Sequence, residues 1–288
     1  MVSAVKSAKT AGAVHVGRLF ASVARRNPNA CAIAFGSKRV SYGALNERVN
    51  RLVDVFRGRG LVHGDRIALL ARNCPEYLEV ELAAAKLGLI TAALNWRLAE
   101  PELRHCIQLA SPSLLIAQPG YVAAIERASD MHRSLLVVDE RYERALSRAS
   151  ADEPQVDIDP EDGLLIIYTS GTTGLPKGAL ISHRAMAYRT LVYSSETAAP
   201  RNASFVAWSP LFHMGASDFA HATLMRGGTV FVVDGYQSDE LIQIVAGEPL
   251  HYLPVVPGMI GPFIESLQSA AIQPCGVNVI GAMPDLVP

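Results

Sequence analysis

The chain has 288 residues, of which half are hydrophobic and 18% are charged, and its formal net charge is -1. This length allows one large domain or two smaller ones with a sizeable core. A nearly neutral charge excludes a global field that would favour nucleic acid or an anionic membrane. The four cysteines form no C-x-x-C pair and no cluster with histidine. This argues against a zinc site or a disulfide framework and suits a reducing cytoplasm.

The amino-terminal stretch predicts a loose leader over residues 1–13. It carries two lysines and small residues but no sustained apolar run of the kind found in a secretory signal peptide. No continuous apolar stretch of the sequence reaches the ~18 residues that a membrane span requires. We therefore expect a cytoplasmic protein without a membrane span.

Short apolar runs recur along the chain and predict β-strands. Most show no period of two, which is typical of strands buried on both faces of a sheet. The runs cover residues 30–35, 66–71, 89–94, 113–117, 134–139, 164–169, 204–208, 229–234, 251–256 and 277–281.

Amphipathic segments of helical length lie between these runs. The first begins at an expected N-cap, Ser41, and stops near Gly58 and Gly60. The second has Pro75 near its start and Gly88 as its stop. Further helices are expected over residues 99–110, 119–129, 182–195, 216–226, 238–247 and 257–270.

The alternation of strands and helices predicts an α/β fold of βαβ units with mostly parallel sheets. Ten strands are too many for one compact sheet with short connections, so we expect two packed α/β subdomains with the ligand site in the crevice between them. The first subdomain is expected at about residues 60–200, and the second at 14–59 together with 201–288. The acidic segment 148–163 is expected to be a surface connection.

The stretch YTSGTTGLPKG, residues 168–178, follows the apolar run 164–167 and predicts a phosphate-binding loop. Glycines permit close backbone approach to an anion, and successive N–H groups in such a turn form an anion-binding concavity. We expect the loop to precede a helix that begins near Ser182. The stretch is not a Walker A loop, because Lys177 is followed by Gly178, and no G-x-G-x-x-G is present. A flexible surface turn is the alternative.

These residues resemble the signature loop of the adenylate-forming enzymes, the superfamily of acyl-CoA synthetases, luciferases and peptide-synthetase adenylation domains. Residues 41–117 resemble the amino-terminal region of that family. SPLFHMGA (209–216) and YLPVVPGM (252–259) resemble its acyl-pocket segments, and VIGAMP (279–284) resembles the segment beside the adenine. Gly258 stands where threonine is usual, and Ile280 where glycine is commoner.

The resemblance implies ATP-dependent activation of a carboxylate to an acyl-adenylate, followed by transfer to coenzyme A, with Mg²⁺ as the metal. Thr169 would help to hold Mg²⁺, and Lys177 and His213 would be the catalytic residues. The implied cofactor-binding residues are Thr169, Ser170, Gly171, Thr172, Thr173, Gly174, Lys177, Gly281, Ala282 and Met283. The implied substrate-binding residues are Phe212, His213, Met214, Gly215, Pro257 and Met259. The implied substrate is a small carboxylate with an apolar acyl chain.

Each of these residues also has a structural interpretation. His213 could be a core histidine, and Lys177 a solvated lysine. Phe212, Met214 and Met259 read as ordinary core packing without the family pattern. Trp96 and Trp208 are expected to pack, and the histidines that show no ligand spacing, His105, His183, His221 and His251, are assigned no role.

Family motifs that follow the adenine-side segment are absent from these residues. They include Y-G-x-T-E, whose glutamate binds Mg²⁺, an aspartate that holds the ribose, a β-barrel, and a small mobile domain with a catalytic lysine. We therefore expect an incomplete amino-terminal large domain, residues 14–288, whose independent activity is doubtful. A partner chain that supplies the missing part could complete it. The alternatives are a non-catalytic remnant or nucleotide- or acyl-binding module, and a fragment of a peptide-synthetase adenylation domain. No aspartate lies within SPLFHMGAS to pair an amino-acid ammonium, although Asp218 follows directly.

Overall fold

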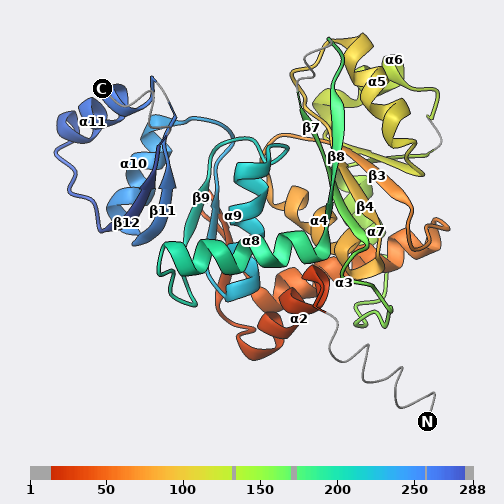
Figure 1. Ribbon diagram of the computed structural model, residues 1–288, viewed down its shortest axis with the longest axis horizontal. Helices are drawn as coiled ribbons and strands as arrows, with labels where there is room; N and C mark the ends of the chain where they lie inside the picture. Colours follow the sequence, from red (N-terminus) through yellow and green to blue (C-terminus); the bar gives the residue numbers. More distant parts are fainter. Residues whose placement is uncertain (1–13, 132–133, 170–173, 257, 283–288) are drawn as a thin grey trace.

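The structure, a computed structural model, describes residues 14–131, 134–169, 174–256 and 258–282. The expected leader, residues 1–13, lies outside this part of the chain. Two six-stranded sheets, each with its own helices, lie at the two ends of the molecule in Figure 1. Among the described helices, none combines the length and the apolar character needed to cross a membrane.

The first sheet is built from the middle of the chain, in the order β6-β5-β3-β4-β7-β8. All of its neighbouring strands are parallel except β7 and β8, which are antiparallel. Its strands are β3 (Arg66–Leu70), β4 (Ile90–Ala93), β5 (Leu114–Ala117), β6 (Leu135–Val137), β7 (Gly163–Thr169) and β8 (Lys177–Ser182).

The second sheet joins the amino-terminal hairpin to the carboxyl-terminal strands, in the order β12-β11-β9-β10-β1-β2. Only β1 and β2 pair antiparallel. Its strands are β1 (Cys31–Phe35), β2 (Lys38–Ser41), β9 (Phe205–Ala207), β10 (Val230–Val232), β11 (Leu250–Pro254) and β12 (Val277–Gly281). The predicted α/β class with two mostly parallel sheets is confirmed, whereas the exact subdomain boundaries stay a prediction.

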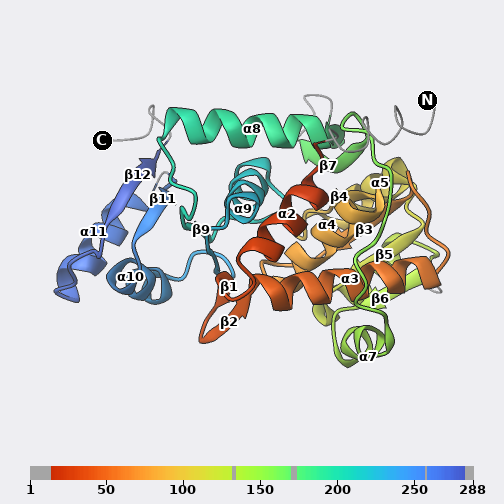
Figure 2. The same ribbon diagram turned by 90° about the horizontal axis from the view of Figure 1, so that it is seen from below.

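Helices cover the sheets and fill the space between them. In Figures 1 and 2, α2, α4 and α9 lie in the centre, and α8 runs along one side of the molecule. The helices are α2 (Val16–Arg26), α3 (Tyr42–Gly58), α4 (Pro75–Leu87), α5 (Glu100–Ala110), the 3₁₀ turn η1 (Pro119–Tyr121), α6 (Val122–Ala128), α7 (Glu140–Arg148), α8 (His183–Glu196), α9 (Met214–Arg226), α10 (Ser238–Gly247) and α11 (Ile260–Ser269).

The predicted caps of α3 and α4 are confirmed. The Ser41 hydroxyl accepts a hydrogen bond from the amide of Ala44 at 3.2 Å, which satisfies one free N–H of the first turn of α3. Helix α4 starts with Pro75 and ends at Gly88 in the left-handed conformation. All but one of the residues of α4 are buried, as expected of a central helix that contacts neighbours on every side.

Among the elements of the described residues, four were not predicted: α2, β2, α7 and β8. The helix expected near Ser182 is confirmed as α8, which begins at His183 with Ser182 as its N-cap, and strand β8 lies between the loop and this helix. Helices α2 and α7 carry narrow apolar stripes among arginines, and the first four residues of β8 are exposed. Such segments lack the continuous apolar run that marks a buried strand or a long buried helix.

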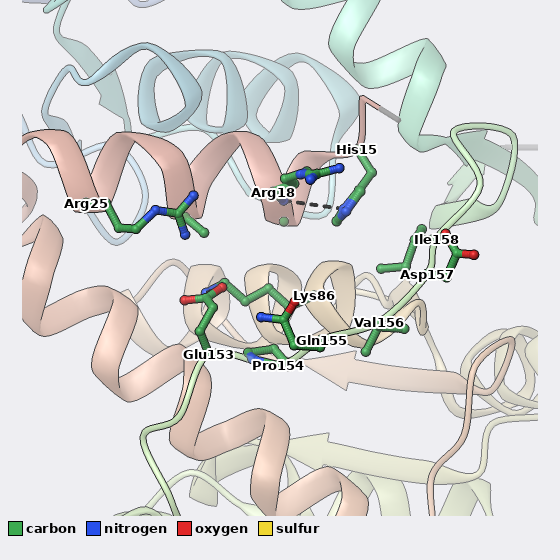
Figure 3. A pocket seen from close by; sticks show the side chains of 12 residues that line it. His15, Arg18, Arg25, Lys86, Glu153, Pro154, Gln155, Val156, Asp157 and Ile158 are labelled. Carbon is green, nitrogen blue, oxygen red and sulfur yellow. Dashed lines mark hydrogen bonds and ion pairs between the residues drawn. The ribbon is translucent and has the colours of Figure 1, made fainter. Parts of the chain in front are cut away.

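A polar groove of about 200 Å³ lies between α2 and residues 153–158 (Figure 3). On its floor, the buried Lys86 ammonium donates to Glu153 at 2.6 Å and to the Asn46 and Asn50 carbonyl oxygens at 2.7 Å. Burial alone would raise the pKa of Glu153, but its hydrogen bonds with Lys86 and the two asparagines bring it below the usual value. The acidic connection is irregular, as expected, yet this satisfied ion pair ties it to α4.

A second buried polar group, Glu81 on α4, lies at the centre of the molecule against α9. Its side chain is fully buried, and neither oxygen accepts a hydrogen bond from any described residue. His221 Nε2 lies 3.7 Å from Glu81 Oε2. Burial raises the pKa of Glu81 well above the usual value, and the nearby Ser217 hydroxyl opposes this only in part. Burial also lowers the pKa of His221 to about 4, so burial favours the neutral form of both groups.

Glu81 predicts a pH-dependent stability. Its folded pKa is raised, so the folded protein holds a proton that the unfolded chain releases above about pH 4.5, and stability is lost as the pH rises. We expect Glu81→Gln to gain free energy of unfolding relative to the natural chain by up to about 1.4 kcal/mol per pH unit in this range. Urea denaturation between about pH 5 and pH 8 measures this difference. Glu81→Leu should show the same trend, and pH-independent differences for both variants would contradict the prediction.

Candidate nucleotide and acyl site

The predicted phosphate loop joins two antiparallel strands. Thr169 ends β7 and pairs with Lys177, the first residue of β8. Both side chains are exposed, and Gly174 has a φ of +98°. The predicted residues Ser170, Gly171, Thr172 and Thr173 lie outside the described residues. Lys177 is therefore held on a strand, directly across from the hydroxyl that precedes the loop.

Helix α5 anchors both arms of this hairpin. The Tyr168 hydroxyl donates to the backbone oxygen of Cys106 at 2.8 Å. On the other arm, His105 Nε2 donates to the backbone oxygen of Pro176 at 3.0 Å. His105 was assigned no role from the sequence, because a contact over such a separation leaves no local pattern. These two bonds fix the chain on either side of the loop.

His213 lies at the amino-terminal end of α9, where it is the N-cap residue and is exposed. Its backbone oxygen accepts from the amides of Ala216 and Ser217 at 3.1 Å. Partial loss of water around the ring lowers its pKa, and the positive charge of Arg97 lowers it further. The imidazole is therefore neutral near pH 7 and offers one donor and one acceptor.

The structure brings His213 to the end of β7 through its neighbour Phe212. The two rings lie 4.3 Å apart, and Phe212 is buried against Ala93 and Ile167 at the carboxyl ends of β4 and β7. Met214 packs against the same cluster. Phe212 thus serves as a packing anchor that places His213 near the phosphate hairpin.

A stack of cations and rings next to Phe212 was not predicted. Trp96 lies 6.4 Å from Phe212, and the guanidinium groups of Arg72 and Arg97 lie 4.8 Å and 4.7 Å from the Trp96 ring. Cation–π contacts of this kind hold positive charge at a fixed place. The sequence gives one hint of this contact: Arg97 directly follows Trp96, shortly after the end of the buried strand β4.

The predicted adenine-side residues lie at the end of β12. Gly281 pairs with Pro254 of β11, and a Cβ at this position would meet the Tyr252 hydroxyl oxygen at 1.8 Å. A side chain at this position would have to displace the Tyr252 ring. Ala282 is exposed, and Met283 lies outside the described residues.

The predicted acyl-pocket residues do not form one cluster among the described residues. Met259 is buried with Trp208 and Leu253 in a core of the second sheet, apart from Phe212. Gly215 is exposed and faces open space, and Pro257 is not among the described residues. This arrangement fits the structural interpretation of Met259.

A cavity of about 500 Å³ lies between α8, α9 and β11. Its walls include Tyr193 of α8, Phe219 of α9 and Tyr252 of β11, and it contains the buried carboxylate of Asp218. Because Tyr252 also contacts the position of Gly281, the cavity borders the predicted adenine side. Neither Tyr193 nor Phe219 was predicted, since their meeting depends on the packing of α8 on α9.

The described residues contain no group of three or more His, Cys, Asp or Glu side chains that could hold a metal ion. Thr169 offers a single hydroxyl. This donor set suits a Mg²⁺ ion that keeps water and substrate phosphate oxygens as most of its ligands, not an all-protein metal cage.

The profile of the AMP-binding enzyme family matches residues 20–278. This chain belongs to that family. It is 31% identical over 237 residues to a feruloyl-CoA synthase from an Amycolatopsis species, a match that covers 82% of this chain and 47% of the relative. It is 32% identical over 243 residues to an indoleacetate–CoA ligase from Aromatoleum aromaticum, covering 81% of this chain and 48% of the relative. The long-chain-fatty-acid–CoA ligase FadD13 of Mycobacterium tuberculosis is 30% identical over 73% of this chain and 43% of its own length.

Solved structures agree with this assignment. The inhibitor-bound N-terminal domain of FACL13 from Mycobacterium tuberculosis has a TM-score of 0.84 at 26% identity, covering 91% of this chain and 67% of that domain. A structure described as a long-chain-fatty-acid CoA ligase from Rhodopseudomonas palustris has a TM-score of 0.86 at 18% identity, covering 96% of this chain and 72% of that one, and shares the fold. The chain spans about half the length of the curated relatives it matches. The predicted family is confirmed, and the named relatives are acyl-CoA ligases.

Proposed function

We propose that this chain binds ATP and a carboxylate and takes part in forming an acyl-adenylate, as the first step of thioesterification to coenzyme A. The observation that carries the proposal is the β7–β8 hairpin, which sets Thr169 across from Lys177 and is packed through Ile167 and Phe212 against His213. One cation and one hydroxyl thus lie at the carboxyl end of β7, and a neutral imidazole contacts the Phe212 ring that packs on this strand.

Positioning and charge compensation would be the contribution of these side chains. The attacking carboxylate and the α-phosphate of ATP are both anionic, so the reaction needs fixed positive charge and alignment more than a covalent intermediate with the protein. Lys177 would offset charge on the leaving pyrophosphate. His213, held at the start of α9, would donate a hydrogen bond to the carboxylate. Mg²⁺, when bound with ATP, would supply further charge, with Thr169 as its protein ligand.

The substrate class in this proposal is an apolar carboxylate. Among the relatives, the printed names cover ferulate, indoleacetate and long-chain fatty acids, so the family leaves open whether this chain takes an aryl or an alkyl acid. A nucleotide- or acyl-binding module without turnover is the second candidate, because the chain spans only about half of those relatives.

Carboxylate-dependent exchange of pyrophosphate into ATP tests the proposal. We expect Lys177→Met to lower exchange by about 10- to 1,000-fold, because it removes a cation that stabilises developing charge. Lys38→Met, which removes an exposed lysine on β2 in the other sheet, is the matched control and should change little.

Binding of ATP, measured by calorimetry on the same proteins, separates the two candidates. ATP binding that Lys177→Met weakens, without exchange, would favour the binding module. A folded chain that neither binds ATP nor catalyses exchange would contradict both candidates.

A further inference from the structure

We propose that Asn73 is a positioning residue for His213: its side chain ties the segment 209–213 to the first sheet and so fixes the place of the imidazole. The inference rests on the proposed function, in which His213 donates a hydrogen bond to the carboxylate. It depends on three features of the described residues: the bonds of the Asn73 side chain, the two sheets that these bonds join, and the short chain between them and His213.

The Asn73 side chain makes four hydrogen bonds in the interior, where the residue is only 4% exposed. Its Nδ2 donates to the backbone oxygens of Ala207 at 3.0 Å, Ser209 at 2.8 Å and Val233 at 3.1 Å. Its Oδ1 accepts from the amide of Leu211 at 2.9 Å. Three acceptors around one atom and one donor at the other allow a single orientation of the amide. An aspartate would turn an oxygen towards three carbonyl oxygens, so the site requires the amide.

These bonds join the two sheets at their carboxyl ends. Asn73 follows β3 of the first sheet, whereas Ala207 is the last residue of β9 and Val233 directly follows β10 in the second sheet. The β7–β8 hairpin of the proposed site belongs to the first sheet, while His213 follows a strand of the second. The relative position of the two sheets therefore decides whether the imidazole and the phosphate hairpin can act on one substrate.

The segment that leads to His213 is short and lies outside helix and strand. Asn73 holds its backbone at Ser209 and Leu211. Phe212, the next residue, is buried against the ends of β4 and β7. The chain thus has a polar anchor and an apolar anchor at the two residues that precede His213. Fixing both residues leaves the imidazole little freedom to shift relative to the first sheet.

Loss of the Asn73 bonds should release this segment without removing a group of the proposed site. In Asn73→Ala the Leu211 amide and the Ser209 oxygen lose their partner, and such groups must find another or reach water. His213 would then move relative to Arg97, whose charge helps to lower the pKa of the ring. A displacement of about 1 Å at a reacting group can lower a rate by about 100-fold.

NMR titration of His213 tests the inference without any need for activity. The imidazole resonance is assigned by its absence from the spectrum of His213→Gln. We expect Asn73→Ala to raise the His213 pKa towards the usual value of 6.5. Asn50→Ala provides the comparison, because Asn50 is equally buried but accepts from Lys86 and donates to the backbone oxygen of Ala151. This variant should lose stability and leave the His213 pKa unchanged.

Carboxylate-dependent exchange of pyrophosphate into ATP separates positioning from a loss of stability. We expect Asn73→Ala to lower this exchange by about 10- to 100-fold in the natural chain. In the His213→Gln background the same substitution should lower it by less than about 2-fold, because the group that Asn73 positions is gone. An asparagine with a purely structural role would lower it by the same factor in both backgrounds.

Hydrogen exchange of the natural chain tests the contact if Asn73→Ala does not fold. The bond between the Leu211 amide and Asn73 must open before this amide can exchange with solvent. We therefore expect the Leu211 amide to exchange at least about 100-fold more slowly than the same amide in an unstructured peptide.

An unchanged His213 pKa in folded Asn73→Ala, equal factors in the two backgrounds, or a Leu211 amide that exchanges as fast as in an unstructured peptide would overturn the inference. The proposed function fails separately. A chain without pyrophosphate exchange would count against that function, while the titration of His213 and the hydrogen exchange of Leu211 still decide whether Asn73 positions the imidazole.

Discussion

Replacing Arg48 by methionine is expected to lower the free energy of unfolding by about 3–5 kcal/mol. Arg48 of α3 donates to Glu79 Oε1 at 2.6 Å and to Glu79 Oε2 at 3.1 Å. The Glu79 side chain is 2% exposed, and burial already raises its pKa. Without the guanidinium, this carboxylate keeps only the hydrogen bond from Tyr142, at 2.8 Å. A buried charge left without its counter-ion is the source of the large loss.

The second carboxylate on the same guanidinium provides the control. Glu143 accepts from Arg48 at 2.7 Å, but its side chain is 54% exposed. Glu143→Gln should therefore lower the free energy of unfolding by less than about 1 kcal/mol, because water can form the hydrogen bonds that the exposed ion pair loses. The double variant Arg48→Met with Glu79→Leu should recover part of the stability, since no buried charge remains. Urea denaturation measures all three. Equal losses for Arg48→Met and Glu143→Gln would contradict the argument.

The elements that could be predicted from the sequence are those that a run of consecutive apolar residues or a local start or stop signal marks. All ten predicted strands are present, although β6 is limited to Leu135–Val137. Helix α4 could be found from its proline start and glycine stop. Helix α2 could not, because its side chain cap, His15, is not a usual capping residue and its buried face is broken by arginines. Strand β8 has exposed residues at an edge, where no apolar run is needed.

The candidate site was predictable only where a local motif carries it. Thr169 and Lys177 belong to one continuous stretch, so their proximity followed from the sequence. The contacts that shape the cavity join residues far apart in the chain, such as Arg189 with Asp218 and Tyr252 with Gly281. These contacts depend on how the helices pack and on which rotamers the packing allows. The periodicity of a single sequence determines neither the packing nor the rotamers. The family resemblance identified the motif residues but not the partners that surround them.

Replacing Gly228 by alanine is expected to destabilise the fold by about 3 kcal/mol or more. Gly228 lies between α9 and β10, where its backbone oxygen accepts from the Tyr42 hydroxyl at 2.7 Å. A Cβ at this position would lie 1.9 Å from the backbone oxygen of Ala203 and 2.8 Å from its carbonyl carbon. The obstacle is backbone, so no side-chain rotation can relieve it. Either the turn before β10 or the segment before β9 must move, which disturbs the centre of the second sheet.

Gly247→Ala is the matched control for this substitution. Gly247 ends α10, and no atom lies within 4 Å of its added Cβ. Alanine is the better helix former, so this variant should be neutral or more stable by up to about 1 kcal/mol. Thermal and urea denaturation of the two variants therefore separate a steric effect from the general effect of losing a glycine. Similar stabilities for the two variants would contradict the prediction. They would show that the backbone at Ala203 can shift at little cost in free energy, and that its close contact with Gly228 does not hold β9 and β10 in place.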